Sequence, residues 1–214
     1  MKIAITGPAG SGKGAISRAI ASRAGFYYVD AGLVFRAIAW LISNNDLRTV
    51  GQLRNEVCEY GLCYSWDGVT SSVSVHGKCL GDILLGSDVS RITAELASSQ
   101  RWFTEMKTTV ESILIGHKDV VVDGRNAGTS VLPDADFIFY IEVNSKVRAQ
   151  RRAKQLGMTS REDQEKILRE IVGRDCVDAD RKFEAYTVPK SAIVVSNDGT
   201  LQACLDAILD NISV

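Results

Sequence analysis

The sequence predicts an α/β fold in which a parallel sheet of five strands is covered by helices on both faces. Short apolar runs alternate with helical patterns along most of the chain, and this alternation is typical of a parallel sheet. A glycine-rich loop follows the first apolar run directly. Of the 214 residues, 45% are hydrophobic and 24% are charged, which are ordinary values for one globular domain.

The predicted strands are apolar runs that end in glycines or polar residues. They cover residues 2–6, 26–29, 119–122, 137–143 and 192–196. Helices are predicted where apolar residues recur every three or four positions, and these segments are residues 15–20, 33–41 and 201–212.

A long stretch from about residue 44 to residue 91 departs from the alternation. Its runs at 63–68 and 73–77 indicate short antiparallel strands with an Asp-Gly turn at Asp67. Because a crossover of this length is unusual in a parallel sheet, we expect an inserted subdomain here.

A second exception is the charge-dense helical stretch from residue 148 to residue 181, which Gly157 interrupts. Its low apolar content predicts a mobile flap rather than a part of the core. It begins with a cluster of arginines at Arg148, Arg151 and Arg152.

Charge and hydropathy bear on the partners of the protein. The net charge is −1, which argues against a nucleic-acid coat or a basic membrane-surface protein. No run approaches the roughly 18–20 apolar residues that span a bilayer, and the first apolar run is too short for a signal peptide. We therefore expect a cytoplasmic monomer with no nucleic-acid or membrane partner.

The five cysteines are odd in number and lack CxxC spacing, and the chain has only two histidines. A structural zinc site is therefore not expected. We interpret the cysteines as reduced thiols, at Cys58, Cys63, Cys79, Cys176 and Cys204.

The glycine-rich loop fits the phosphate-binding pattern GxxxxGK. It consists of Gly7, Pro8, Ala9, Gly10, Ser11, Gly12 and Lys13. Backbone N–H groups of such a loop turn inward around a phosphate, and the next helix adds the positive end of its dipole. Because a strand precedes the loop and a helix follows it, we assign nucleotide binding to it, with Lys13 at the outer phosphates.

The residue after this lysine commonly holds Mg²⁺ through a hydroxyl, but it is Gly14 here and Ala15 follows it. We therefore predict no strong direct protein ligand, with Mg²⁺ held by phosphate oxygens and water. Ser11 and Ser17 are weaker candidates.

Two carboxylates end predicted strands at the carboxyl edge of the sheet, where such folds bind ligands. Asp123 follows the third strand and Asp30 follows the second. We expect both to contact the water molecules of the metal. The alternative is that each is a helix cap or an ordinary loop carboxylate.

Phosphoryl transfer between two phosphorylated substrates requires several cations. Arg36 lies in the second helical pattern and Arg125 directly after the third strand. Arg174, Asp178 and Arg181 are spaced by four and three residues, so they share one face of a helix. The alternative for these basic helices is a solvated charged face.

With these motifs the chain resembles the bacterial cytidylate kinases, which phosphorylate CMP and dCMP. The resemblance rests on four segments in the family's order, at residues 7–14, 30–36, 123–129 and 174–181. The first pattern, GPxGxGKG, is shared by many small kinases, whereas DGRxxGT followed by RD…D…R is far more specific.

The resemblance implies a P-loop nucleoside-monophosphate kinase fold in a single domain. The core would comprise residues 1–43, 94–151 and 182–214, with a monophosphate-binding insertion at about 44–93 and a lid at about 152–181. It also implies transfer of the γ-phosphoryl group of ATP to CMP or dCMP, with Mg²⁺, in pyrimidine nucleotide metabolism.

The resemblance also carries over site residues by position. Lys13, Asp123, Arg125 and Arg174 would be catalytic, and residues 7–15 with Arg151 and Arg152 would bind ATP. Arg36, Arg125 and Arg174 would hold the acceptor phosphate, Asp178 the ribose hydroxyls, and Arg181 would lie near the sugar and base. The remaining acceptor-site positions are Asp30, Ala31, Ser99, Lys107 and Asn126, of which Ser99 and Lys107 align only loosely.

Three features depart from the family. Ala31 replaces a Ser or Thr, Asn126 replaces an Asp, and the helical segment after Ser90 is shorter. Because a carboxylate near the base becomes an amide, we expect CMP to remain a substrate with weaker discrimination against UMP.

Two alternatives stay open. One is a kinase for another small acceptor, such as UMP, dAMP or a sugar acid. The other is a catalytically weak nucleotide-binding regulatory protein. A GTPase switch is not expected, because the sequence contains no NKxD motif.

Overall fold

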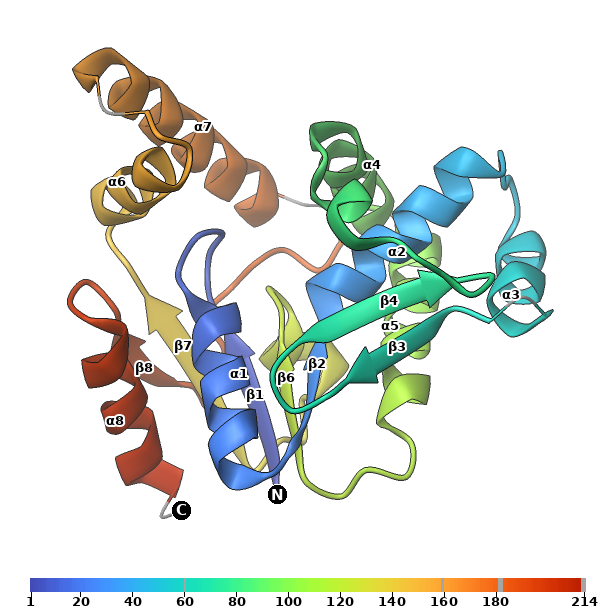
Figure 1. Cartoon of the computed structure of the whole chain (residues 1–214), viewed down its shortest axis with the longest axis horizontal. Coiled ribbons are helices and arrows are strands. Elements are labelled where there is room, and N and C mark those ends of the chain that lie inside the picture. Colours follow the sequence, from blue (N-terminus) through green and yellow to red (C-terminus); the bar gives the residue numbers. More distant parts are fainter. Residues whose placement is uncertain (60, 159, 181–182, 213–214) are drawn as a thin grey trace.

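The central sheet of the computed structural model has five parallel strands (Figure 1). The structure describes residues 1–59, 61–158, 160–180 and 183–212. The spatial order of the strands is β2-β6-β1-β7-β8. The bounds are β1 Lys2–Thr6, β2 Tyr27–Asp30, β6 Val120–Asp123, β7 Phe137–Glu142 and β8 Ile193–Ser196. The predicted parallel sheet of five strands is therefore confirmed.

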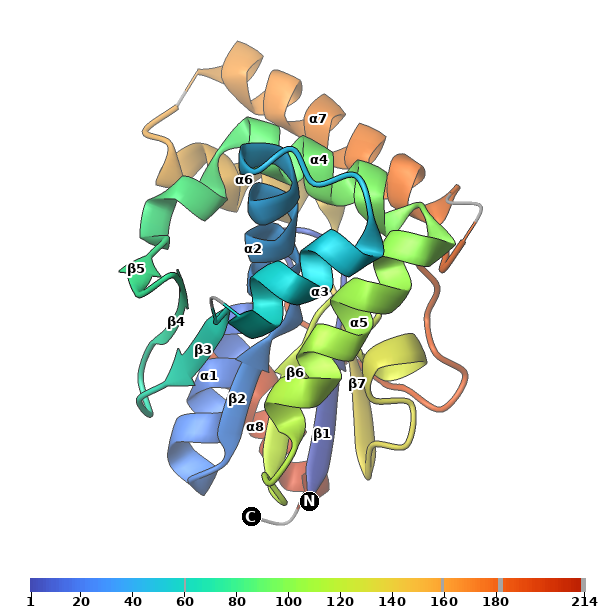
Figure 2. The ribbon, with the colours of Figure 1, turned by 90° about the vertical axis from the view of Figure 1, so that its right-hand side faces the viewer.

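Helices cover both faces of this sheet, as predicted. On one face, α1 (Lys13–Ala24) and α8 (Leu201–Ile212) pack against residues such as Ile5, Val121 and Phe139. On the other face, α2 (Ala31–Asn44) and α5 (Gln100–Leu114) pack against alternate residues such as Val122; Figure 2 shows α5 in front of the strands. Both faces are apolar because successive strand residues point to opposite sides and each side meets helices.

The β2–α2 junction shows how the sequence sets the ends of these elements. Asp30 is the last residue of β2 and the N-cap of α2, where its Oδ1 accepts a hydrogen bond from Leu33 N at 2.8 Å. A carboxylate at this position satisfies an amide that has no partner within the helix. The helix-cap alternative for Asp30 is therefore correct, and the same residue also lies at the carboxyl edge of the sheet.

The stretch between α2 and α5 contains a small antiparallel sheet, as expected. Its strands are β3 (Cys63–Trp66), β4 (Ser71–Val75) and β5 (Lys78–Cys79), and its helices are α3 (Val50–Glu59), a 3-10 turn at Gly81–Leu85 and α4 (Ser87–Ala97). Val73, Val75 and Leu84 pack against Ala37 and Leu41 of α2.

The two turns of this sheet differ from the expectation of one Asp-Gly turn. Asp67 and Gly68 belong to a four-residue connection, in which the Asp67 carboxylate accepts from Val69 N and Thr70 N. The tight two-residue turn is at His76 and Gly77, whose φ values are 53° and 72°. Two successive positive φ values are typical of a type I′ hairpin turn.

Two charged helices stand beyond the carboxyl ends of the strands (Figure 1). They are α6 (Ser145–Gln155) and α7 (Arg161–Ala179), and the predicted break at Gly157 lies between them. They share a small apolar cluster of their own, formed by Ala149, Ala153 and Ile167. None of the helices in the part of the chain that the structure describes is long and apolar enough to span a bilayer.

Candidate active site

The phosphate-binding loop connects β1 to α1 and is shaped by close backbone contacts. A Cβ on Gly7 would lie 2.9 Å from the carbonyl oxygen of Ile141, and a Cβ on Gly12 would lie 2.7 Å from Nδ2 of Asn197. Asn197 is buried and donates to the Ser11 carbonyl at 2.8 Å. Only glycine fits at these two positions, and Gly12 also has a φ of 85°.

Lys13 is the first residue of α1 and lies among charged residues that were predicted from the sequence to belong to the site. Its Nζ donates to the Pro8 carbonyl at 3.3 Å. Burial lowers the pKa of Lys13, the charges of Asp123 and Asp30 oppose this, and those of Arg125 and Arg36 add to it. The fold therefore gathers all five residues at one edge of the sheet.

The two carboxylates are neighbours because Asp30 and Asp123 are register partners in β2 and β6. Asp123 is only 3% exposed, and the hydroxyl of Tyr28 donates to its Oδ2 at 3.1 Å. Burial, followed by the charge of Asp30, raises the pKa of Asp123 to about 7. Asp123 is thus poised to change its charge near neutral pH.

The environment of Gly14 bears on how a metal could be held. A Cβ on Gly14 would lie 3.3 Å from Asp123 Oδ2 and 3.6 Å from Nη1 of Arg18, so the space that a hydroxyl would use is lined by charged groups. The hydroxyls of Ser11 and Ser17 are buried, and neither has a hydrogen-bond partner in the described segments.

Metal-ligating side chains are sparse across the described ranges. No group of three or more His, Cys, Asp or Glu side chains there is arranged to hold an ion. The donor set at the loop is instead two neighbouring carboxylates, Asp30 and Asp123. Such a set fits a hydrated Mg²⁺ that phosphate oxygens ligate directly.

The arginines expected to serve the acceptor have different environments. Arg125 forms an ion pair with Asp178 of α7, whose side chain is 3% exposed. The Arg36 guanidinium lies 4.0 Å from Asp30, and its buried Nε has no partner in the described part of the chain. Arg174 is exposed one helical turn before Asp178, and Arg181 lies outside the described residues.

The two positions that depart from the family are both buried. Ala31 is 4% exposed and packs against Gly124, where a Cβ would lie 3.3 Å from its own. Asn126 is 7% exposed, and its Nδ2 donates to the carbonyl oxygen of Glu184 at 3.2 Å. Glu184 is a contact that the sequence gave no reason to expect.

The loosely aligned positions both lie on α5. Ser99 is the N-cap of this helix, although its side chain makes no capping hydrogen bond. Lys107 is half-buried and lies 3.4 Å from Glu111 on the next helical turn. Their part in acceptor binding stays a prediction.

Arg148 differs in its contacts from the other two arginines of the basic cluster, and the sequence alone did not predict this difference. Arg148 is 5% exposed; its Nη1 donates to the Ala9 carbonyl at 3.1 Å, and its Nη2 to Asp175 at 2.6 Å. It thus joins the phosphate-binding loop to α7. Arg151 donates to the Gly199 carbonyl at 2.8 Å, and Arg152 is exposed.

The prediction from the sequence did not include Tyr28 or Asn197 among the site residues, although the position of each relative to a strand end was one indication. Tyr28 lies two residues before Asp30 in a strand, so both side chains point to the same face. Asn197 follows β8 directly, at the same carboxyl edge as Asp123. An Asn at the end of a short apolar run could have been added to the candidate residues on that ground.

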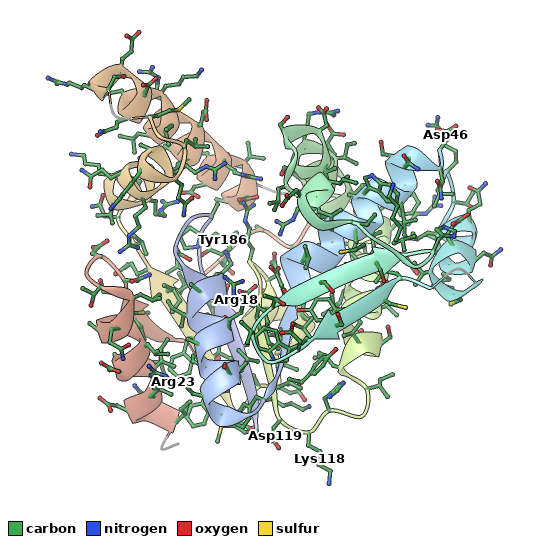
Figure 3. The ribbon with its side chains drawn as sticks, viewed as in Figure 1. Arg18, Arg23, Asp46, Lys118, Asp119 and Tyr186 are labelled. Carbon is green, nitrogen blue, oxygen red and sulfur yellow. The ribbon has the colours of Figure 1, made fainter. Side chains whose placement is uncertain are left out.

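A cleft of about 450 Å³ lies at the opposite end of the sheet. Its lining includes Tyr27, Trp66, His117, Lys118 and Asp119, which precede or flank the amino ends of the strands. Figure 3 labels Lys118 and Asp119 there, far from Arg18 and Tyr186. Ligands of open parallel sheets bind at the carboxyl edge, so the candidate active site is the loop edge and not this cleft.

Comparisons with known proteins show which family the chain belongs to. The sequence profile described as "Cytidylate kinase" matches residues 3–214. The cytidylate kinase of Clostridium tetani is 32% identical, with 99% of this chain and 91% of that protein covered. The one of Caldanaerobacter subterraneus is 33% identical, with 91% of this chain and 86% of that protein covered.

Other relatives are longer or more distant. The chain spans 39% of the bifunctional pantoate ligase/cytidylate kinase of Prochlorococcus marinus, with 31% identity. A solved structure from Thermus thermophilus, TT1252, is 17% identical with a TM-score of 0.52 and covers all of this chain and 96% of its own; this likeness concerns the fold. Since the profile match extends over almost the whole sequence, the chain belongs to the cytidylate kinase family.

Proposed function

We propose that this chain transfers the γ-phosphoryl group of ATP to CMP or dCMP, giving ADP and CDP or dCDP. Family membership supports this activity. The observation that carries it is the meeting of Lys13 of the phosphate loop with Asp30, Asp123, Arg36 and Arg125 at one edge of the sheet. A donor site and a set of cations for a second phosphate thus lie side by side, as transfer between two phosphorylated substrates requires.

The donor side is assigned to the loop. Residues 7–15 would cradle the phosphates of ATP through backbone N–H groups, with Lys13 at the outer phosphates. Arg151 and Arg152 would also bind these phosphates, and Arg148 donates to the Ala9 carbonyl of the loop. When bound, Mg²⁺ would supply positive charge at the phosphate oxygens, and Asp30 and Asp123 would accept hydrogen bonds from its water molecules.

The acceptor side is assigned to the arginines and to α7. Arg36, Arg125 and Arg174 would bind the monophosphate, and Asp178 the ribose hydroxyls. Because Arg125 and Asp178 are paired with each other here, acceptor binding would have to replace this ion pair with two contacts to the substrate. The buried Nε of Arg36 has no hydrogen-bond partner among the described residues, and a phosphate oxygen would satisfy this donor.

The insertion at about 44–93 and the lid at about 152–181 complete the proposed site. The insertion would cover the acceptor, and the lid would close over both substrates. Arg181 would lie near the sugar and base, with Ser99 and Lys107 at the periphery. Closure would exclude water, so that hydrolysis of ATP does not compete with transfer.

The reaction requires no covalent enzyme intermediate. An oxygen of the acceptor phosphate attacks the γ-phosphorus of ATP while the bond to the β–γ bridging oxygen breaks, and ADP leaves. The protein contributes alignment and positive charge: Lys13 and the arginines stabilise the equatorial oxygens as charge moves toward ADP. We place this reaction in cytoplasmic pyrimidine nucleotide metabolism, performed by a monomer with no nucleic-acid or membrane partner.

The alternative of a regulatory protein that binds ATP without turnover is less well supported. Binding ATP alone gives no reason for Arg36 and Arg125 to lie near Lys13, or for Asp178 to pair with Arg125. The deciding experiment is to incubate the full chain with Mg·ATP and each of CMP, dCMP, UMP and AMP, and to measure the diphosphate formed. Turnover of CMP or dCMP is expected; ATP binding without any diphosphate would favour the regulatory protein, and turnover of UMP or AMP alone would favour another acceptor.

A further inference from the structure

Residues 183–186, between α7 and β8, contact other parts of the protein at both of their ends. Phe183 packs edge-on against Phe103 of α5, with ring centroids 5.6 Å apart. Tyr186 stacks on Tyr140 of β7, with centroids 6.1 Å apart, and its N–H donates to the Asp178 carbonyl at 3.0 Å. Glu184 and Ala185 lie between these anchors.

Glu184 contacts the segment after β6 in two ways. Its carboxylate accepts a hydrogen bond from the hydroxyl of Ser130, which is 5% exposed. Its backbone carbonyl accepts from Nδ2 of Asn126 at 3.2 Å. Glu184 has a φ of 50°, an uncommon conformation for a residue other than glycine, so local preference alone does not explain its placement. The carboxylate contact with Ser130 is one interaction that holds it there.

This contact fixes the orientation of the Asn126 amide. A carbonyl oxygen can only accept, so it must face the amide nitrogen of Asn126 and not its oxygen. The Thr129 hydroxyl lies 3.4 Å from the same nitrogen. Since the two ends of a planar amide point in different directions, Oδ1 of Asn126 is directed away from Glu184.

The orientation matters because the candidate bases differ in one group. Cytosine carries an amino donor at N4, and uracil carries an acceptor oxygen at O4. Oδ1 of Asn126 can accept a hydrogen bond from N4 of cytosine. It cannot form one with O4 of uracil, because both oxygens are acceptors. The Asn126 nitrogen already donates to the Glu184 carbonyl and to the Thr129 hydroxyl, which uses both of its hydrogens. To donate to uracil, the amide would have to give up one of these bonds or rotate, and rotation would leave Oδ1 and the carbonyl of Glu184 as two acceptors facing each other in a buried position.

We infer that Glu184 is a positioning residue for base choice: anchored by Ser130, it orients the amide of Asn126 so that the site accepts an amino-bearing pyrimidine and rejects a keto-bearing one. This inference rests on the proposed function and on the family resemblance, which implies that Asn126 lies near the acceptor base. It opposes the weaker discrimination against UMP that the exchange of Asp for Asn predicts from the sequence. The amide of Asn126 would present its oxygen to the base, instead of presenting either its oxygen or its nitrogen.

The arrangement also accounts for an amide at position 126. A carboxylate there would have no hydrogen to donate to the Glu184 carbonyl. It would also meet the negative charge of Glu184 at a position that is 7% exposed, where like charges are costly. Asn126 and Glu184 are therefore physically matched to each other.

The test is steady-state kinetics of the full chain with saturating Mg·ATP and either CMP or UMP. The variants are Glu184→Ala, Ser130→Ala, their combination and Glu184→Gln, with Glu95→Ala as a control at an exposed, paired glutamate. We expect Glu184→Ala and Ser130→Ala each to lower the CMP-to-UMP ratio of kcat/KM roughly tenfold. The double variant should lose no more than either single one, because both act through the same contact.

The conservative variant separates positioning from a general structural effect. Glu184→Gln keeps an oxygen that accepts from Ser130, so it should keep the parental ratio, as should Glu95→Ala. A merely structural role would lower kcat/KM for CMP and UMP together and leave their ratio unchanged.

The outcomes also distinguish this inference from the proposed function. If the parent phosphorylates CMP but the ratio changes less than threefold in both Glu184→Ala and Ser130→Ala, Glu184 does not set base choice. If the parent forms no diphosphate from CMP or dCMP, the proposed function fails first. Should Glu184→Ala not fold, Ser130→Ala and Glu184→Gln still decide the question.

Discussion

At the scale of single residues, burial shifts the pKa values of charged groups beside the phosphate-binding loop. It lowers the pKa of Lys13 and raises that of Asp123. Mutual attraction opposes both shifts, because each group favours the charged form of the other. The buried hydroxyl of Tyr28, whose own pKa burial raises, remains a hydrogen-bond donor to Asp123.

The raised pKa of Asp123 predicts a pH-dependent stability. An aspartate that titrates at about 4 in the unfolded chain and at about 7 in the folded one contributes stability that is fully present below about pH 4 and lost as the pH rises through about 7. Asp123→Asn does not titrate, so without ligands its Tm should exceed that of the parent by more at about pH 8 than at about pH 5. A difference of several degrees is expected, since each kcal/mol shifts Tm by about 2–4 °C at this size.

Thermal unfolding of both proteins across this pH range measures the effect. Asp46→Asn serves as the control, because it alters an exposed carboxylate, and its Tm difference from the parent should stay constant. A Tm difference for Asp123→Asn that is equally constant would show that Asp123 does not titrate in this window.

Removal of the loop lysine should abolish turnover without unfolding the protein. Lys13→Ala deletes a charge that stabilises the transferring group, and single electrostatic stabilisers of this kind contribute about 100- to 1,000-fold to kcat. ADP production and thermal unfolding are measured together, with Lys118→Ala at the opposite end of the sheet as the control (Figure 3). Activity of Lys13→Ala within threefold of the parent would remove Lys13 from the mechanism.

At the scale of elements, one arginine couples the phosphate loop to α7. Arg148 of α6 bonds to Ala9 of the loop and to Asp175 of α7, and the hairpin of α6 and α7 otherwise rests on a small apolar cluster. The bond to the loop therefore orients a hairpin that has little core of its own.

Arg148→Ala should loosen α7 and weaken ATP binding. The loss leaves the Ala9 carbonyl and Asp175 without this donor, which costs about 1–3 kcal/mol for buried groups. We expect faster hydrogen exchange across residues 161–179 and a several-fold higher KM for ATP, with an intermediate effect for Arg148→Lys. Arg161→Ala, at a side chain that is 94% exposed, is the matched control; exchange in Arg148→Ala equal to that in this control would contradict the coupling.

At the scale of the whole molecule, the ion pair between Arg125 and Asp178 joins the core to the far end of α7. In the proposed reaction both residues would contact the acceptor nucleotide. The proposed lid, which includes α7, would therefore have to give up this ion pair when substrates bind. We expect residues 161–179 to exchange faster without ligands and to become protected with a non-hydrolysable ATP analogue and CMP together. Hydrogen exchange with no ligand, each ligand alone and both ligands measures this, and equal protection in all four states would rule out closure.

Much of the site was visible in the sequence because its residues stand at the ends of strands. In a parallel sheet these ends meet at one edge, so Asp30, Asp123 and the glycine-rich loop had to lie together. Arg36 and Arg125 follow two of those strands within a few residues and had to be near. The helical spacing of Arg174 and Asp178 likewise placed both on α7, although their separate environments did not follow from it.

The sheet, the helices on its two faces, the phosphate loop and the family could be predicted from the sequence, because each depends on local periodicity or on contiguous motifs. The folded molecule was needed to show that Arg148 reaches the loop, that Tyr28 donates to Asp123, and that Asn126 donates to the Glu184 carbonyl. Those contacts join residues 139, 95 and 58 positions apart. No local pattern records such pairings, because packing between distant segments selects one side chain among several of the same type.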